Sequence, residues 1–131
     1  MLDRDDMIQI ARARLHDADA LVEARRYDGA IYLCGYAVEM ALKTRICKTL
    51  HWSAYPETRG EFRGYQSFRT HDLDVLLRLS GVEEELRREH LSDWLTMAEW
   101  DPEARYKPIG SGSEADAKSM IESARILLEA L

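Results

Sequence analysis

Polar side chains recur along one line of residues 27–50, YDGAIYLCGYAVEMALKTRICKTL. In a helix, which turns by about 100° per residue, these side chains fall within about 60° of one another and form a ridge. The ridge consists of Tyr32, Tyr36, Glu39 and Lys43. Glu39 stands four residues before Lys43, the favourable order for an ion pair, so the ridge combines a charge pair with two phenol groups.

Two interpretations of this ridge are open. The tyrosines can pack with their hydroxyl groups at the rim while the ion pair keeps part of the helix soluble. Alternatively, Gly29 and Gly35 on either side of the ridge permit close backbone approach, and an exposed ridge buries against a second copy of the chain in a homodimer.

Positive charge gathers in the middle of a chain that is acidic overall. Residues 43–69 hold six basic and two acidic side chains, a local net charge of +4, whereas the whole chain carries −6. Arginines alternate there with aromatic residues: Arg59, Phe62, Arg63, Tyr65, Phe68 and Arg69. Arginine binds phosphate through parallel hydrogen bonds and aromatic rings stack on bases, so this segment predicts a nucleotide or RNA site. The alternatives are solvated loop arginines, rings that cover the end of a bundle, or arginines that pair with acidic residues.

Other kinds of site find no support in the sequence. The histidines show no i, i+4 pair and no Cys-x-x-Cys sequence accompanies them, so we predict neither a metal site nor a cofactor. There is no Gly-x-Ser-x-Gly turn, and GSGS at 110–113 is interpreted as a flexible linker rather than a phosphate loop. Cys34 and Cys47 fall on helix faces more than about 100° apart and are predicted to be reduced core thiols.

Hydrophobic periodicity predicts an all-α fold with no strands. We expect a helix over residues 4 to about 26 with Asp3 as its cap, a central helix over 27–50 and a short helix within 71–81. Two more helices are expected, one from about 83 to 100 and one from about 114 onward. Their capping boxes are predicted to be Ser80 with Glu83 and Ser113 with Asp116. The result is an up-and-down bundle of four long helices plus one short helix in a single domain, 1–131.

The composition indicates a globular chain without a membrane span. About half of the residues are hydrophobic and a third are charged, which argues against disorder. No stretch reaches the roughly 20 uncharged apolar residues of a membrane helix, and the N-terminal MLDRDDMIQ is acidic where a signal peptide is basic. We therefore expect a cytoplasmic location.

Three segments, in their order along the chain, resemble a known family. GAIYLCGYAVEMALK at 29–43, THDL at 70–73 and ARY at 104–106 are similar to the HEPN domain (higher eukaryotes and prokaryotes nucleotide-binding), and the resemblance covers nearly the whole chain. It implies a four- to five-helix bundle and frequent dimerisation. It also implies a small stand-alone prokaryotic protein, often encoded beside a minimal nucleotidyltransferase in a system of toxin-antitoxin type.

Many HEPN proteins are metal-independent ribonucleases that carry an arginine and, four to six residues later, a histidine near the C-terminal part of the bundle. That motif is missing at its expected place, because no histidine follows Arg105. Only Arg45 and His51 have the spacing, and they lie at the end of the central helix. His71 is a further candidate, by its proximity in sequence to Arg63 or Arg69.

These observations favour a non-catalytic subunit that binds nucleotide or RNA and acts with a minimal nucleotidyltransferase. The alternative is a metal-independent HEPN ribonuclease toxin. The candidate anion-binding residues are Lys43, Arg63, Arg69, His71, Arg105 and Tyr106. The interface candidates are Tyr32, Tyr36 and Glu39, and no catalytic residue is assigned. The expected partners are a second copy of the chain, the nucleotidyltransferase and nucleotide or RNA, without a membrane.

Overall fold

The computed structural model describes residues 1–131, except for the side chain of Arg105. The predicted all-α class is confirmed. The α-helices are α1 (Arg4–Glu23), α2 (Tyr27–Leu50), α3 (Leu73–Ser80), α4 (Glu83–Glu89), α5 (Leu91–Ala98) and α6 (Glu114–Ala130). Two 3-10 helices, η1 (Gln66–Phe68) and η2 (Pro102–Tyr106), lie in the connections.

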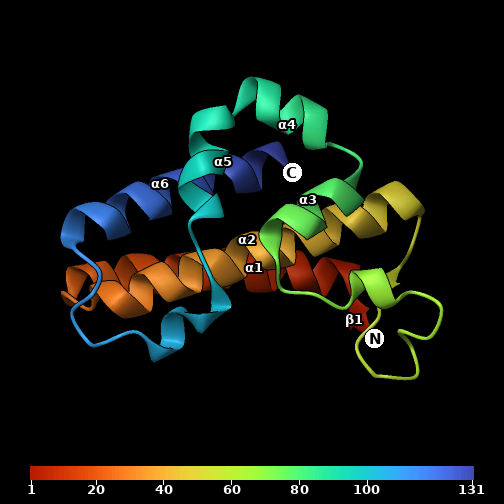
Figure 1. Ribbon diagram of the computed structural model, residues 1–131, viewed down its shortest axis with the longest axis horizontal. Helices are drawn as coiled ribbons and strands as arrows, with labels where there is room; N and C mark the ends of the chain where they lie inside the picture. Colours follow the sequence, from red (N-terminus) through yellow and green to blue (C-terminus); the bar gives the residue numbers. More distant parts are fainter.

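Helices α1 and α2 form a long antiparallel hairpin, and the other helices cover it (Figure 1). Helix α6 packs along one half of the hairpin and α3 along the other half, while α5 packs on α6. Helix α2 contacts α1, α3 and α6, as its apolar residues on nearly every side predicted. It is therefore the central element of the fold.

Local capping explains where two of the long helices begin. Asp3 accepts hydrogen bonds from the backbone N–H groups of Asp5 and Asp6 and caps α1, as predicted. Ser113 and Asp116 form the predicted capping box of α6. These polar side chains satisfy N–H groups that have no partner inside the helix.

The helix expected from about 83 to 100 is in fact two helices. His90, between α4 and α5, has φ −135° and ψ 36°, outside the helical region. The predicted capping box of Ser80 and Glu83 is also wrong, because Ser80 is the buried last residue of α3. Its hydroxyl donates to the carbonyl of Leu77 and accepts from the N–H of Val82. The bundle therefore has three long helices and three short ones rather than four and one.

A two-stranded antiparallel sheet joins the start of the chain to the connection after α2, although no strand was predicted. Strand β1 (Leu2–Asp3) pairs with β2 (Ala54–Tyr55), with Leu2 opposite Tyr55. The strands are only two residues long, too short for an alternating pattern to stand out in the sequence. This pairing fixes one end of the 51–72 connection beside the N-terminus of α1 (Figure 1).

Both cysteines are free and buried, as predicted. Burial raises the pKa of the Cys34 thiol to about 12 and that of the Cys47 thiol to about 11. Both side chains therefore stay protonated at neutral pH and act as small core residues.

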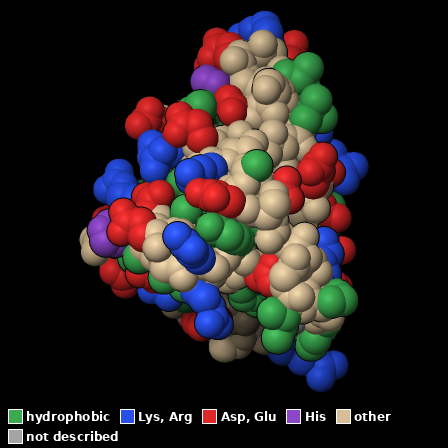
Figure 2. Space-filling model, turned by 90° about the vertical axis from the view of Figure 1, so that its left-hand side faces the viewer, with side chains coloured by type: hydrophobic (Ala, Val, Ile, Leu, Met, Phe, Trp, Pro, Cys, Tyr) green, Lys and Arg blue, Asp and Glu red, His purple; other side chains and the backbone are tan. Residues whose placement is uncertain are grey.

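Charged side chains of both signs are spread over the end of the molecule that Figure 2 faces, with hydrophobic side chains in smaller patches between them. Among the described residues, no helix is long and apolar enough to cross a membrane. The most exposed large hydrophobic residues are Ile109 and Tyr106, in the connection between α5 and α6.

That connection is held against α2, although GSGS was predicted to be a flexible linker. The carboxylate of Asp28 accepts hydrogen bonds from the backbone N–H of Gly110 at 2.6 Å and of Gly112 at 2.7 Å. The Cα of Gly112 lies so close to α2 that an added Cβ would be 2.5 Å from Ile31 Cδ1. Asp28 and Gly112 therefore fix the path of the chain before α6.

The Asp28 contact predicts a low-pH titration of two backbone amides. The N–H groups of Gly110 and Gly112 hold the pKa of Asp28 below its ordinary value of 3.8. A depressed carboxyl pKa stabilises the fold above the unfolded-state value, and this contribution is lost as pH falls through the folded-state pKa. We expect both amide proton NMR signals to shift together with a midpoint below 3.8. The shift should vanish in Asp28→Asn, and a midpoint at or above that value would contradict the assignment.

Candidate nucleic-acid interface

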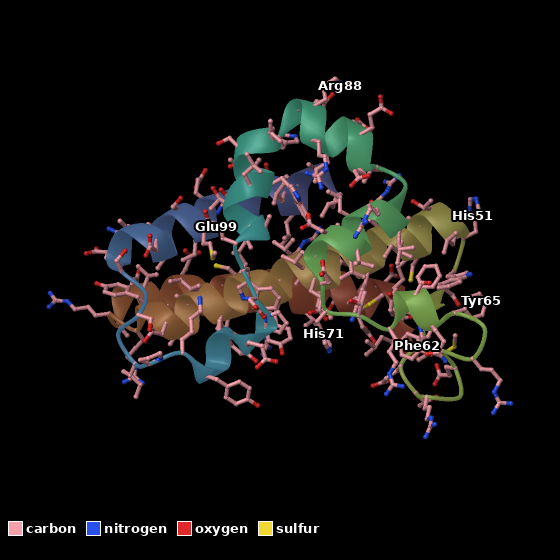
Figure 3. The ribbon with its side chains drawn as sticks, viewed as in Figure 1. His51, Phe62, Tyr65, His71, Arg88 and Glu99 are labelled. Carbon is pink, nitrogen blue, oxygen red and sulfur yellow. The ribbon has the colours of Figure 1, made fainter. Side chains whose placement is uncertain are left out.

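Glu39 and Lys43, the C-terminal two residues of the predicted ridge, form an ion pair that is buried rather than exposed. Lys43 Nζ lies 2.9 Å from Glu39 Oε2, and the side chains of Glu39 and Lys43 are 1% and 9% exposed. His71, which precedes α3, places Nδ1 3.0 and 3.1 Å from the two carboxylate oxygens (Figure 3). Glu39 is therefore covered by this chain's own residues and is not available to an exposed interface, contrary to the prediction.

This arrangement also corrects the expected role of Lys43. Its ammonium group donates to Glu39 and lies 5.2 Å from the ring centroid of Tyr55. Burial raises the pKa of the Tyr55 hydroxyl, which donates to the carbonyl of Phe68 at 2.6 Å. Lys43 thus joins α2 to the 51–72 connection and does not present its charge to a phosphate.

Tyr32 and Tyr36, the N-terminal two residues of the ridge, pack against Trp100. The hydroxyl of Tyr32 donates to that of Tyr36, and the ring centroid of Tyr36 lies 5.6 Å from that of Trp100. Trp100 Nε1 donates to the backbone carbonyl of Tyr32, and the indole lies directly on the Cα of Gly35. Gly35 was predicted to admit the backbone of a second copy. Instead it admits an indole ring of the same chain.

The 51–72 connection forms an aromatic cluster over one end of the bundle. Phe62 is 6% exposed and Tyr55 is fully buried, and their ring centroids are 6.4 Å apart. Phe62 therefore cannot stack on a base, contrary to expectation. Tyr65 remains 48% exposed beside the half-buried ring of Trp52, at 5.3 Å between centroids (Figure 3). One exposed aromatic surface is left for a ligand.

The arginines of this connection, Arg59, Arg63 and Arg69, are exposed to solvent. Within the described part of the chain no ion pair involves them. The two acidic residues of the connection, Glu57 and Glu61, pair instead with the α-amino group of Met1 at 3.4 and 3.1 Å. Both carboxylates are therefore paired with the α-amino group of Met1. The predicted pairing of the arginines with acidic residues is not found among the described side chains.

Arg69 links this surface to the buried cluster. Its guanidinium carbon lies 5.9 Å from the ring centroid of Phe62, which packs on Tyr55, the partner of Lys43. The structure thus connects Arg69 through Phe62 and Tyr55 to Lys43, in the C-terminal half of α2. We call the exposed part of this region, formed by Arg59, Arg63, Tyr65 and Arg69, the basic loop.

The remaining predicted residues lie apart from the basic loop or outside the described side chains. Arg45 is half-buried and its Nε has no hydrogen-bond partner among the described residues. His51 is exposed in a left-handed conformation, φ 58°, at the end of α2, and no hydrogen bond or ion pair among the described side chains joins it to Arg45. Tyr106 is 71% exposed in η2. The side chain of Arg105 lies outside the described residues.

His71 has the geometry of an oriented imidazole. A carboxylate only accepts hydrogen bonds, so Nδ1 is the donor to Glu39, and Nε2 is not engaged by this contact. The side chain of His71 is 63% exposed and borders a groove of about 420 Å³. Asp72, Asp74 and Asp101 line the same groove and disfavour a polyanion there.

Comparison with protein families matches the HEPN domain over residues 5–60. These residues belong to the HEPN domain family. The match spans α1, α2 and β2 and therefore includes Glu39, Lys43 and Arg59. Comparisons with curated proteins and with solved structures found no match. HEPN membership is consistent with a role in nucleotide or RNA binding or in RNA cleavage.

Sequence reasoning missed three aromatic residues. Tyr55 contacts Lys43, Trp52 packs beside Tyr55, and Trp100 packs on Tyr36. Trp52 and Tyr55 lie in a connection without periodicity, and Trp100 contacts a helix that ends 50 residues earlier in the chain. A signal for Trp100 was present: Gly35 inside a long buried helix marks a place where another group approaches closely.

Proposed function

We propose that this chain is a HEPN subunit that binds nucleotide or RNA through the basic loop and does not cleave it. The observation that carries this proposal is the set of three exposed arginines, without ion pairs among the described residues, in the same connection as the exposed ring of Tyr65. Guanidinium groups recognise phosphate and a tyrosine ring stacks on any base, so the ligand is a single strand or a nucleotide rather than a specific sequence.

The proposal includes the partners that HEPN membership suggests. The subunit acts with a minimal nucleotidyltransferase in a system of toxin-antitoxin type, as a homodimer in the cytoplasm. The acidic remainder of the chain supports a local rather than a general affinity for nucleic acid, because like charges repel phosphate away from the basic loop. Sedimentation at micromolar concentration and co-purification with the product of the neighbouring gene test these partners.

If the basic loop binds RNA, arginine variants inside and outside the loop should differ in their RNA affinity. Arg63→Ala and Arg69→Ala should each weaken binding of a short labelled RNA by about fivefold, the effect of one charged contact of about 1 kcal/mol. The matched control is Arg26→Ala, an exposed arginine at the other end of α2 that has no ion pair among the described residues. Fluorescence anisotropy measures all three. Equal losses at Arg26 and Arg63 would remove the basic loop from consideration.

A metal-independent ribonuclease is the second candidate. The contact between Glu39 and His71 favours it, whereas the acidic residues of the groove beside His71 disfavour RNA there. A carboxylate that orients Nδ1 leaves Nε2 able to take a proton from a ribose 2′-hydroxyl. His71→Ala should then abolish cleavage of RNA by the purified protein, whereas a double change of Arg45 and His51 should leave it intact. If the double change alone abolishes cleavage, the spacing motif is the active one.

A further inference from the structure

A second site lies at the opposite end of α2 from the basic loop. A groove of about 580 Å³ opens between α2, the end of α5, α6 and the connection that contains η2. Its volume lies within the range of small-molecule sites. The connection with η2, which lines the groove, and the 51–72 connection lie at different ends of the long hairpin (Figure 1). A ligand in the groove is therefore separate from the proposed RNA.

The outer wall of this groove is held in place before any ligand binds. The two hydrogen bonds from Gly110 and Gly112 to Asp28 fix the connection against α2. At the other end, Asp101 caps η2 by accepting from the N–H of Glu103. A wall that is already ordered costs a ligand little conformational entropy on binding.

The floor of the groove is apolar. Ile31 from α2 and Met120 from α6 line it together with Trp100, and the residues are half-buried or buried. Trp100 is held by the hydrogen bond from its Nε1 to the carbonyl of Tyr32. This floor favours a ligand with a hydrocarbon body over one that is polar throughout.

Among the described residues of the rim, acidic side chains outnumber basic ones. Four residues that line the groove are acidic, whereas Lys107 is the one basic residue described there. Glu99, at the end of α5, is exposed and takes part in no hydrogen bond or ion pair with the described residues (Figure 3). Asp116, from α6, lines the same groove. One of its carboxylate oxygens accepts a hydrogen bond from the backbone N–H of Ser113. The ligand that matches this rim is a cation.

The carboxylates are not arranged for a metal ion. Among the described residues, no group of three or more histidine, cysteine or acidic side chains lies close enough to hold one. Carboxylates that line one groove together with apolar side chains instead suit a ligand whose positive charges are separated by methylene groups. Each ammonium can then meet a carboxylate while the carbon chain covers the floor.

We propose that this groove binds a linear polyamine. One ammonium group pairs with Glu99, a second lies near Asp116, and the methylene chain packs on Ile31 and Met120. Glu99 also borders the neighbouring groove of His71, so a longer polyamine extends past Glu99 toward α3.

Isothermal titration calorimetry of the RNA-free protein with spermidine tests this site. We expect saturable binding that weakens about three- to tenfold in Glu99→Gln, the loss of one partly enclosed charged contact. Glu129→Gln is the matched control, because Glu129 is an exposed carboxylate of α6 outside the groove without an ion pair among the described residues. Ser119→Arg places a guanidinium in the groove from an exposed position on α6 and should abolish binding.

Three outcomes would overturn the proposal. These are no saturable heat up to millimolar spermidine, equal weakening in Glu99→Gln and Glu129→Gln, or Mg²⁺ binding that competes with spermidine and depends on Glu99 to the same degree. Circular dichroism of each variant establishes that the fold is retained. Loss of RNA binding in the basic-loop variants leaves this test unaffected, so the two proposals fail separately.

Discussion

Replacing Glu39 with alanine is expected to lower the free energy of unfolding by about 3 to 5 kcal/mol, the cost of leaving one member of a buried ion pair without its partner. Lys43 would lose its carboxylate partner in a site where its side chain is 9% exposed, and Nδ1 of His71 would lose its contact with Glu39. Urea unfolding followed by circular dichroism measures the loss. This effect is larger than that of an exposed i, i+4 pair, which contributes a few tenths of a kcal/mol.

A double variant separates the buried charge from the packing around it. Glu39→Leu with Lys43→Met removes both charges and fills a similar volume, so it should recover most of the stability that Glu39→Ala loses. Glu114→Ala is the surface control, because Glu114 pairs with Lys118 at i, i+4 and both side chains are more than half exposed. If Glu39→Ala costs no more than Glu114→Ala, the ion pair is not buried in solution.

Replacing Gly35 with alanine is expected to destabilise the protein by about 1 to 3 kcal/mol, as overpacked cores do. A Cβ at this position would lie 1.8 Å from Trp100 Cε2, so the indole must leave its place on α2 beside Tyr36. Its hydrogen bond to the carbonyl of Tyr32 would be lost as well. Thermal unfolding and the fluorescence of Trp100 should change together.

The effect of Gly35→Ala on the free energy of unfolding should change sign when the indole of Trp100 is absent. In a Trp100→Ala background, Gly35→Ala removes a flexible residue from a helix interior and meets no ring, so it should stabilise by up to about 1 kcal/mol. A destabilising effect of equal size in both backgrounds would mean that Trp100 does not pack on Gly35.

The elements that could be predicted are those that depend on neighbours in sequence. The apolar periodicity of α1 and α6 and the caps at Asp3 and Ser113 were read correctly, because each is specified within one or two turns of helix. The break at His90 was missed because the apolar spacing of Leu86 and Trp94 continues across it. A periodic pattern reports which side of the chain is buried and does not require one unbroken helix.

The sequence identified residues of the candidate site, but it did not predict which of them are buried or in contact with one another. The sequence placed Glu39 and Lys43 on one line of α2, and their burial depends on His71 and Tyr55, which arrive from the following connection. The exposure of Arg63 and the burial of Phe62 could not be separated by sequence, since both stand in a segment without regular periodicity. Contacts between residues far apart in the chain decide these outcomes.

The salt dependence of RNA binding is the most direct test of the claim that the basic loop contacts phosphate. Each phosphate contact on a single strand contributes about 0.7 to the slope of log affinity against log salt concentration. We predict that the double variant Arg63→Ala with Arg69→Ala has a slope smaller by about 1.4 than the unmodified chain. A slope that is unchanged in this variant, at any affinity, would contradict the assignment of RNA binding to the basic loop.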